Sequence, residues 1–348
     1  MAARSMPRPS LQAQWAGGSG PGSAKPPPRT RRRPAVAAPA ATSSCSSAQR
    51  VTLPDGTALE VLSAVPAPAS AGPTSLPSRP PLLFVHGSAH AAWCWADHFL
   101  PWFAERGWPA HAVSLRGRGR SGPPPPGAKA GGTLASHAAD LAAVVGAGYG
   151  LEDGGGAPRA STTPILVGHS FGGLVAQAAA ADPNFPLAGL ILASSVPPSG
   201  NGPMIARIAA ATGLWATAVT TADFVLQRYR TSPASARRLF FSEGMPEAEV
   251  ARLVALLAAN DGDKPVIDVR AIGRELPVAP PARPGLPALV LGGAADTIVD
   301  AAGLVETAAA VRAGHPVILP GLAHDIMLDV GWEAAAGAMA DWLLAAYV

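Results

Sequence analysis

The chain has 348 residues, of which 48% are apolar and 14% charged, and its formal net charge is +3. This composition fits a globular enzyme with a sizeable core better than a disordered binder. The two cysteines, Cys45 and Cys94, provide neither a disulfide framework nor metal-ligand spacing. The closest candidate for a transmembrane segment, Ile208–Ala222, contains four threonines and is shorter than the roughly 18 residues that span a bilayer.

The basic charge is concentrated in the leader, residues 1–49. The first 50 residues contain eight Lys or Arg and no acidic residue, whereas the rest of the chain carries 18 basic and 23 acidic groups. A basic, acid-free segment rich in Ser, Ala and Pro is typical of an organelle transit peptide. The alternative is that Arg29–Arg33 (RTRRR) forms a nuclear or nucleic-acid signal. Because many prolines disfavour an amphipathic mitochondrial helix, we expect a plastid (chloroplast) location, with the mitochondrion as the alternative.

The first part of the main body, residues 50–196, predicts alternating strands and helices. Two β-rich runs flank Asp55-Gly56, which indicates a hairpin, and residues 66–80 form a Pro/Ser/Ala linker. Further strands are expected at 80–87, 109–115, 164–168 and 187–195, with helices at 92–107, 134–145 and 173–182. The helix at 92–107 is expected to kink or restart at Pro101.

Strand signals disappear from residue 197 to about residue 285, where helical segments take over. The alternation then resumes, with strands at 287–293 and 315–320, a helix at 304–313 and a terminal helix from Trp332. Alternating elements predict an α/β fold, a mostly parallel twisted sheet covered by helices. We therefore expect a core formed by 50–196 and 286–348, with a helical cap, 197–285, inserted after the sixth strand.

A serine surrounded by glycines, in the segment PILVGHSFGG, lies between a predicted strand and a predicted helix. A tight strand-to-helix turn holds the residue at its tip in a strained conformation and presents its Oγ above the sheet. Neighbouring side chains would collide in such a turn, which explains Gly168 and Gly172, and Gly173 allows close packing of the helix. We expect Ser170 to be a nucleophile, which needs an adjacent base.

With a serine on a turn of this kind, the catalytic acid and then the histidine follow later in the chain, so both are expected downstream of Ser170. His324 lies in a loop after the last strand and is the expected base, whereas His315 begins a strand and is expected to be buried and structural. Asp296 closes the preceding strand and is the expected acid, which would orient the base and stabilise its imidazolium. Asp300 is expected to start the next helix, and Asp325 is expected to point away from the base.

The tetrahedral intermediate needs hydrogen-bond donors for its oxyanion. The first predicted strand of the parallel sheet ends in FVHGSAH, where the turn at Gly87 can direct the backbone N–H of Ser88 inward. The backbone N–H of Phe171, directly after the serine, is the expected second donor. His86 and His90 are expected to shape this loop.

These motifs together resemble those of a known family. VHGSAHAAWCW, GHSFGG, GGAAD and GLAHDIML are similar to segments of α/β-hydrolase fold enzymes of the capped esterase/lipase type, over residues 50–348. The HGxxHxxW form resembles plant methylesterases and hydroxynitrile lyases. The lyases carry a lysine directly after the histidine, where this chain has Asp325. Relatives that open epoxides or remove halides use an aspartate at the elbow, and Ser170 excludes that chemistry.

We therefore expect a serine hydrolase that cleaves an apolar carboxylic ester through an acyl-enzyme. The alternatives are a lyase or carbon–carbon-bond hydrolase with the same triad, and a binding protein that keeps the fold without turnover. No zinc-protease or phosphate-loop motif is present, so we expect neither a metal nor an organic cofactor. The expected partner is a small-molecule ester. Contact of the apolar cap with a membrane surface is a weaker expectation.

The segment LRGRGRSG, residues 115–122, resembles an arginine–glycine segment that binds nucleic acid. Its place directly after a strand favours a structural loop. Contact with an anionic group of the substrate is an alternative. No wider basic patch follows the leader, so no nucleic-acid partner is expected.

Overall fold

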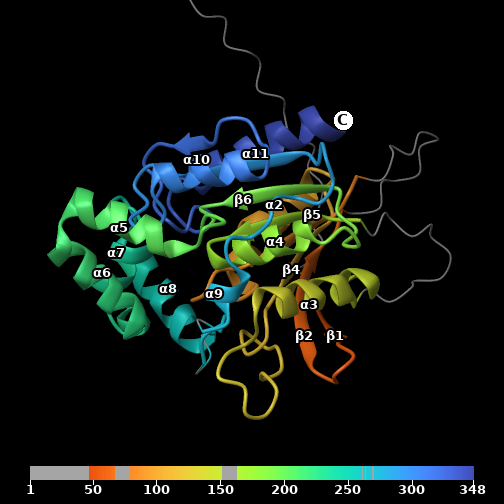
Figure 1. Cartoon of the computed structure of the whole chain (residues 1–348), viewed down its shortest axis with the longest axis horizontal. Coiled ribbons are helices and arrows are strands. Elements are labelled where there is room, and N and C mark those ends of the chain that lie inside the picture. The colour runs from red at the N-terminus through yellow and green to blue at the C-terminus, as the bar shows by residue number, and fades with distance from the viewer. Residues whose placement is uncertain (1–46, 67–78, 151–162, 261, 263, 269) are drawn as a thin grey trace, which may run out of the picture. The chain divides into compact units, whose positions relative to one another are not determined.

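The computed structural model describes residues 47–66, 79–150, 163–260, 262, 264–268 and 270–348 (Figure 1). Nearly all of the predicted transit peptide and of the predicted linker lies outside this part of the chain. These two predictions therefore stay predictions, although residues 47–49 belong to the first strand. Within the described residues, no helix has both the length and the apolarity needed to cross a bilayer.

An eight-stranded sheet forms the centre of the described residues, in the order β1-β2-β4-β3-β5-β6-β7-β8. Its strands are β1 (Ser47–Thr52), β2 (Ala58–Ala64), β3 (Leu82–Val85), β4 (Ala110–Val113), β5 (Ile165–His169), β6 (Gly189–Ala193), β7 (Ala288–Gly293) and β8 (Val317–Leu319). β1 pairs antiparallel with β2, and β2 antiparallel with β4, whereas all pairs from β4 to β8 are parallel. The predicted hairpin and mostly parallel sheet are confirmed.

Helices cover both faces of the sheet, and the alternation of side chains along each strand divides the core in two. On one face Leu82 and Phe84 pack with α1 (Trp93–Ala96), α2 (Phe99–Glu105) and α11 (Trp332–Tyr347). On the other, Leu83 and Val85 pack with α3 (Leu134–Gly146), α4 (Phe171–Ala181) and α10 (Ala301–Ala310). β3 to β6 are buried at every position. Because helices cover both faces of these strands, their sequences are almost entirely apolar.

Two predicted helix starts differ from the structure. The break in the helix at 92–107 lies at Asp97 and His98, and α2 begins at Phe99, two residues before Pro101. Proline is tolerated in a first helical turn because its missing N–H would have no intrahelical acceptor there. The helix expected from residue 304 begins at Ala301, and Asp300 caps it by accepting a hydrogen bond from the Gly303 N–H. The predicted role of Asp300 as a helix start is confirmed.

The segment between β6 and β7 is helical, which confirms a cap inserted after the sixth strand. It contains α5 (Asn201–Thr212), α6 (Leu214–Val225), α7 (Pro233–Phe240), α8 (Glu247–Asn260) and α9 (Ile272–Glu275). α5 to α8 form a group beside the sheet (Figure 1). Local signals stabilise two of these helices, since the Ser232 side chain caps α7 and acidic residues occupy the first turn of α8.

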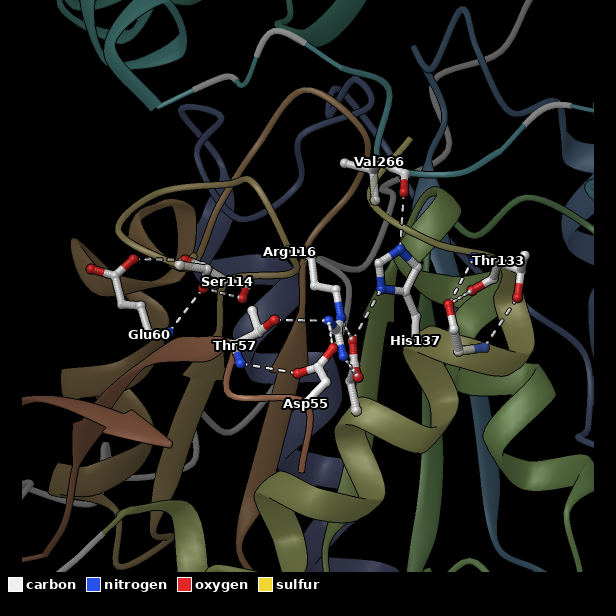
Figure 2. Close-up of polar contacts among 11 residues, drawn as sticks. Asp55, Thr57, Glu60, Ser114, Arg116, Thr133, His137 and Val266 are labelled. Carbon is white, nitrogen blue, oxygen red and sulfur yellow. Dashed lines mark hydrogen bonds and ion pairs between the residues drawn. The ribbon is translucent and has the colours of Figure 1, made fainter. Parts of the chain in front are cut away.

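The arginine–glycine segment after β4 is held by intramolecular contacts. Arg116 binds both carboxylate oxygens of Asp140 at 2.7 Å and also contacts Asp55, in the turn of the hairpin (Figure 2). This hydrogen bond with Arg116 lowers the pKa of Asp55 to about 2. The buried side chain of Arg118 donates to the carbonyl oxygens of Gly262 and Lys264. These contacts support the structural interpretation of the loop.

Candidate active site

Ser170 occupies the turn between β5, which ends at His169, and α4, which begins at Phe171. Its backbone has φ +55° and ψ −124°, a conformation that side-chain-bearing residues rarely adopt and that requires support from its surroundings. Both flanking elements belong to the core: β5 is buried at all five positions, and most residues of α4 are buried. The serine is therefore held on a strained turn between two rigid elements.

Glycines make this turn possible because other backbone lies against it. A Cβ atom at Gly172 would lie 2.3 Å from the carbonyl oxygen of His86 and 2.6 Å from that of Val85. One at Gly87 would lie 2.9 Å from the Cβ of Ser170. The loop after β3 therefore passes directly beside the serine, at a distance that only glycine allows.

The other two glycines bring α4 close to the neighbouring strands. A Cβ at Gly168 would lie 2.7 Å from the carbonyl oxygen of Gly172, and one at Gly173 would lie 2.1 Å from the Oγ of Ser195. Ser195 follows β6, the strand next to β5. All four glycines singled out from the sequence thus have a steric reason in the structure.

His324 and Asp296 lie together although 28 positions separate them in the chain. Asp296 follows β7 and His324 follows β8, and these strands are adjacent and parallel. The His324 Nδ1 lies 2.8 Å from Asp296 Oδ2, with both side chains almost fully buried. The other oxygen of Asp296 accepts the backbone N–H groups of Ile298 and Val299. Donation from Nδ1 to the carboxylate leaves Nε2 of His324 as the basic nitrogen.

The electrostatic surroundings favour a protonated His324. Burial alone would lower the pKa of its imidazole, but the charge and hydrogen bond of Asp296, with the charge of Asp325, raise it above the ordinary value. A base with a raised pKa accepts a proton readily and holds the resulting imidazolium. This is the property that proton abstraction from a serine requires.

The loop that carries His324 is attached to the turn that carries the serine. His169, adjacent to Ser170, donates through Nε2 to the carbonyl oxygen of His324 at 3.0 Å, and the two rings are 4.7 Å apart between centroids. Ser170 also lines one cavity with Thr297, which follows Asp296. The structure therefore brings the three residues predicted as serine, base and acid to one edge of the sheet.

The two residues predicted as oxyanion donors flank the serine turn: Ser88 follows Gly87, which lies against Ser170, and Phe171 follows Ser170 itself. Ser88 lies in a turn closed by a hydrogen bond from the His90 N–H to the Gly87 carbonyl. Phe171 is the first residue of α4, where backbone N–H groups have no acceptor within the helix. His86 shapes this loop as expected, since its Nε2 accepts the Leu115 N–H at 2.9 Å and its Nδ1 contacts the Gly87 carbonyl.

One sequence-based expectation near the site is wrong. His315 is exposed and precedes β8 by two positions; this edge strand of three residues is too short to bury it. Asp325, which we expect to point away from the base, directs a fully buried carboxylate to His90, whose Nε2 lies 2.8 Å from its Oδ2. A Leu328 N–H and an Asp329 N–H both donate to the Asp325 carbonyl, and this tight turn bends the chain inward.

Asp325 joins a cluster of imidazoles that the sequence did not reveal. One nitrogen of His169, one of His324 and one oxygen of Asp325 lie within 4.8 Å of one another. Among the described residues this is also a set that could hold a metal ion, but its histidines already serve other partners: Nε2 of His169 donates to a carbonyl, and Nδ1 of His324 faces Asp296. The spacing of these residues in the sequence contains no signal of the cluster.

Helices α5, α6 and α7 of the cap contribute residues to a cavity beside Ser170. This cavity of about 160 Å³ lies between Ser170 and the cap, and its apolar lining includes Met204, Ile208, Phe224 and Leu239. A second cavity of about 550 Å³ reaches Asp296, and Ile208, Thr217, Thr220 and Thr297 line both. The two cavities are therefore neighbours, one at the serine and one at the acid.

At the start of α6, Leu214 and Trp215 are 81% and 82% exposed. Exposed large apolar side chains are typical of contact sites. The expected weak contact with a membrane surface stays a prediction, and this part of the cap is where it would occur.

Solved structures share this architecture at low sequence identity. The chain is similar to a candidate lipase of Acinetobacter baumannii, with a TM-score of 0.61, 15% identity, and 87% of this chain and 92% of that one covered. An esterase of a Rhodococcus species gives a TM-score of 0.53 at 20% identity, with 86% of this chain and 98% of that one covered. A membrane phospholipase A described as a bacterial virulence factor gives a TM-score of 0.58 at 17% identity, with 87% of each chain covered. At these identities the likeness shows the fold alone.

No curated protein sequence matches the chain significantly. A family profile described as "Alpha/beta hydrolase family" matches residues 82–340, which include β3 to β8 and the cap. The chain therefore belongs to the alpha/beta hydrolase family.

Proposed function

We propose that the chain is a serine hydrolase that cleaves a carboxylic ester through an acyl-enzyme on Ser170. The observation that carries this proposal is the strained backbone of Ser170 at one edge of the sheet with the His324–Asp296 pair, whose nitrogen and oxygen lie 2.8 Å apart. A strained, glycine-flanked serine is costly for a fold and is typical of a nucleophile. The solved relatives called lipase, esterase and phospholipase support ester hydrolysis as the reaction class.

The reaction follows from the roles of these groups. Nε2 of His324 takes the proton of the Ser170 hydroxyl as its Oγ attacks the ester carbonyl, and Asp296 stabilises the imidazolium. The backbone N–H groups of Ser88 and Phe171 stabilise the oxyanion, a contribution of about 10²–10³ in rate for each donor. The alcohol leaves with the proton from His324. Water activated by the same histidine then releases the acid and restores the serine.

The cavity beside the serine indicates the size of the group it accepts. Its volume is about 160 Å³ and its lining is mainly apolar. An apolar cavity of about 150 Å³ accommodates a molecule the size of benzene. We therefore propose an ester with a short aliphatic or single-ring acyl group as the substrate.

A fluorophosphonate probe that labels activated serines tests the proposal on the full chain. We expect stoichiometric labelling of the wild-type protein and none of Ser170→Ala, measured by intact mass. Ser195→Ala is the matched control. Ser195 follows the end of β6 and is fully buried, so its replacement should leave labelling unchanged. Absence of labelling in folded wild-type protein would contradict the proposal and favour a binding protein.

A panel of p-nitrophenyl esters then separates the remaining alternatives. Hydrolysis of acetate, butyrate or benzoate esters faster than the decanoate ester is the expected result. A protein that is labelled on Ser170 but hydrolyses none of these esters would favour the lyase or carbon–carbon-bond hydrolase alternative.

A further inference from the structure

Asp325 is a fully buried carboxylate that the proposed reaction does not use. Its Oδ2 lies 2.8 Å from Nε2 of His90 and its Oδ1 lies 3.7 Å from Nε2 of His169. Taking a carboxylate out of water is costly unless partners compensate it. A buried acid beside a proposed catalytic base therefore needs a reason.

The neighbouring Asp329 shows what a purely structural acid looks like in the same loop. Asp329 is equally buried, and its oxygens accept the backbone N–H groups of Ser242, Ala323 and Val330 and the hydroxyl of Ser242. Asp325 has no such partners: within the described residues neither of its oxygens accepts a backbone N–H. Its carboxylate faces imidazole rings instead.

The cluster joins the parts of the site that must keep their mutual positions. His90 belongs to the turn after β3 that carries the expected oxyanion donor, and His169 precedes the nucleophile. Asp325 itself follows His324, and its backbone N–H donates to the carbonyl of Phe240 at the end of α7. One carboxylate thus contacts the oxyanion loop and the nucleophile turn, while its backbone is attached to the cap.

We propose that Asp325 is a positioning residue for the proposed hydrolysis, on which this inference rests: its buried carboxylate holds the oxyanion loop, the nucleophile turn and the base loop together, and its negative charge stabilises the imidazolium that forms on His324. The proton that His324 receives comes from the Ser170 hydroxyl and leaves with the alcohol. Asp325 exchanges no proton and contacts no reacting atom.

The charges around Asp325 agree with this role. Burial by itself would raise the pKa of Asp325, but His90, His169 and His324 lower it, so the group is ionised at neutral pH. Burial lowers the pKa of His169 to about 3, which keeps that ring neutral. Burial and the charge of Asp325 raise the pKa of the Cys94 thiol, which stays protonated.

In the proposed reaction the imidazole of His324 gains a proton. This ring is flanked by two carboxylates, those of Asp296 and Asp325. Asp296 meets Nδ1 directly, and an oxygen of Asp325 lies within 4.8 Å of a ring nitrogen. Attraction between opposite charges at such a separation is strong inside a protein, where water screens it poorly. Removal of the Asp325 charge should therefore make the imidazolium harder to form.

The test measures the rate of fluorophosphonate labelling against pH for wild type, Asp325→Asn and Asp329→Asn. Labelling needs a neutral base, so its rate rises with pH through the pKa of His324. In D325N we expect the midpoint to move to lower pH and the plateau rate to fall about 10-fold or more, the factor typical of losing one interaction with a charged group. In D329N we expect the midpoint of the wild type, whatever the loss of thermal stability. A D325N midpoint and plateau equal to those of the wild type would overturn the proposal.

A second variant keeps the test decisive if D325N does not fold. The double variant His90→Phe with Asp325→Leu replaces both members of the buried pair, which leaves no unpaired charge and is often neutral for stability. The same lower midpoint and slower labelling are expected. A folded double variant that labels like the wild type would overturn the proposal. Absence of wild-type labelling would instead contradict the proposed function, so the two failures are distinguishable.

Discussion

The close approach of the oxyanion loop to the serine turn yields the sharpest prediction, for the substitution Gly172→Ala. The added Cβ would lie 2.3 Å from the His86 carbonyl oxygen and 2.6 Å from that of Val85. Both obstacles are backbone atoms at the end of a buried strand, so no side-chain rotation can relieve the contact. The Cβ and the His86 oxygen would have to separate by at least 0.7 Å to reach 3.0 Å, the limit for real contacts.

A shift of this size acts on both stability and rate. Overpacking in a core costs about 1–3 kcal/mol, and a misplacement of about 1 Å in an active site can cost about 10²-fold in rate. We therefore expect G172A to lower the melting temperature by several degrees, as follows from about 2 °C per kcal/mol in a protein of this size. The rate of fluorophosphonate labelling should fall about 100-fold.

A second glycine provides the matched control. Gly337 lies within α11, and a Cβ added there meets nothing within 4 Å. Gly337→Ala should stabilise the protein by up to about 1 kcal/mol, because alanine favours a helix over glycine, and should leave labelling unchanged. A melting temperature and a labelling rate of G172A equal to those of G337A would contradict the steric role of Gly172.

Four further predictions address the triad, its pH dependence, the cavity and the leader. Asp296→Asn should lower kcat for ester hydrolysis about 10⁴-fold with little change in the circular dichroism spectrum, because His324 loses the acceptor that selects its tautomer; a loss below 10-fold would contradict this role. The neighbouring carboxylates raise the pKa of His324, and the base must be neutral to act. Wild-type kcat/KM should therefore rise with pH and reach half its plateau above the ordinary histidine pKa of about 6.5. A midpoint below that value would contradict the assignment of His324 as the base. Phe224→Ala should enlarge the cavity at the serine and shift the preferred p-nitrophenyl ester to a longer acyl chain, and an unchanged profile would argue that the acyl group binds elsewhere. Residues 1–49 fused to a fluorescent protein should direct it to plastids, and retention in the cytosol or nucleus would contradict the transit-peptide prediction.

Local patterns in the sequence were sufficient for most of the architecture. Apolar runs ended by glycine located β3 and β5, because strands buried on both faces are mostly apolar. The loss of strand signals after residue 196 indicated the cap. The tight turn at Ser170 was also predictable, since its requirement for small neighbours is a local steric property.

Other features depend on contacts that no local pattern records. Asp296 was chosen from the end of a strand, but its 2.8 Å contact with His324 exists only because β7 and β8 are parallel neighbours. His315 was expected to be buried because it precedes an apolar run, yet that run forms an exposed edge of the sheet.

Asp325 illustrates the difference between features that follow from local sequence patterns and features that arise from tertiary contacts. The sequence determined the order of strands, helices and cap and the turn that carries Ser170, because these follow from the spacing of apolar residues and glycines along the chain. The cluster of Asp325 with His90 and His169 joins three loops separated by 79 and 156 positions. Such contacts arise only when parallel crossovers bring the ends of distant strands to one edge. The electrostatic surroundings of the base were therefore a property of the folded chain alone.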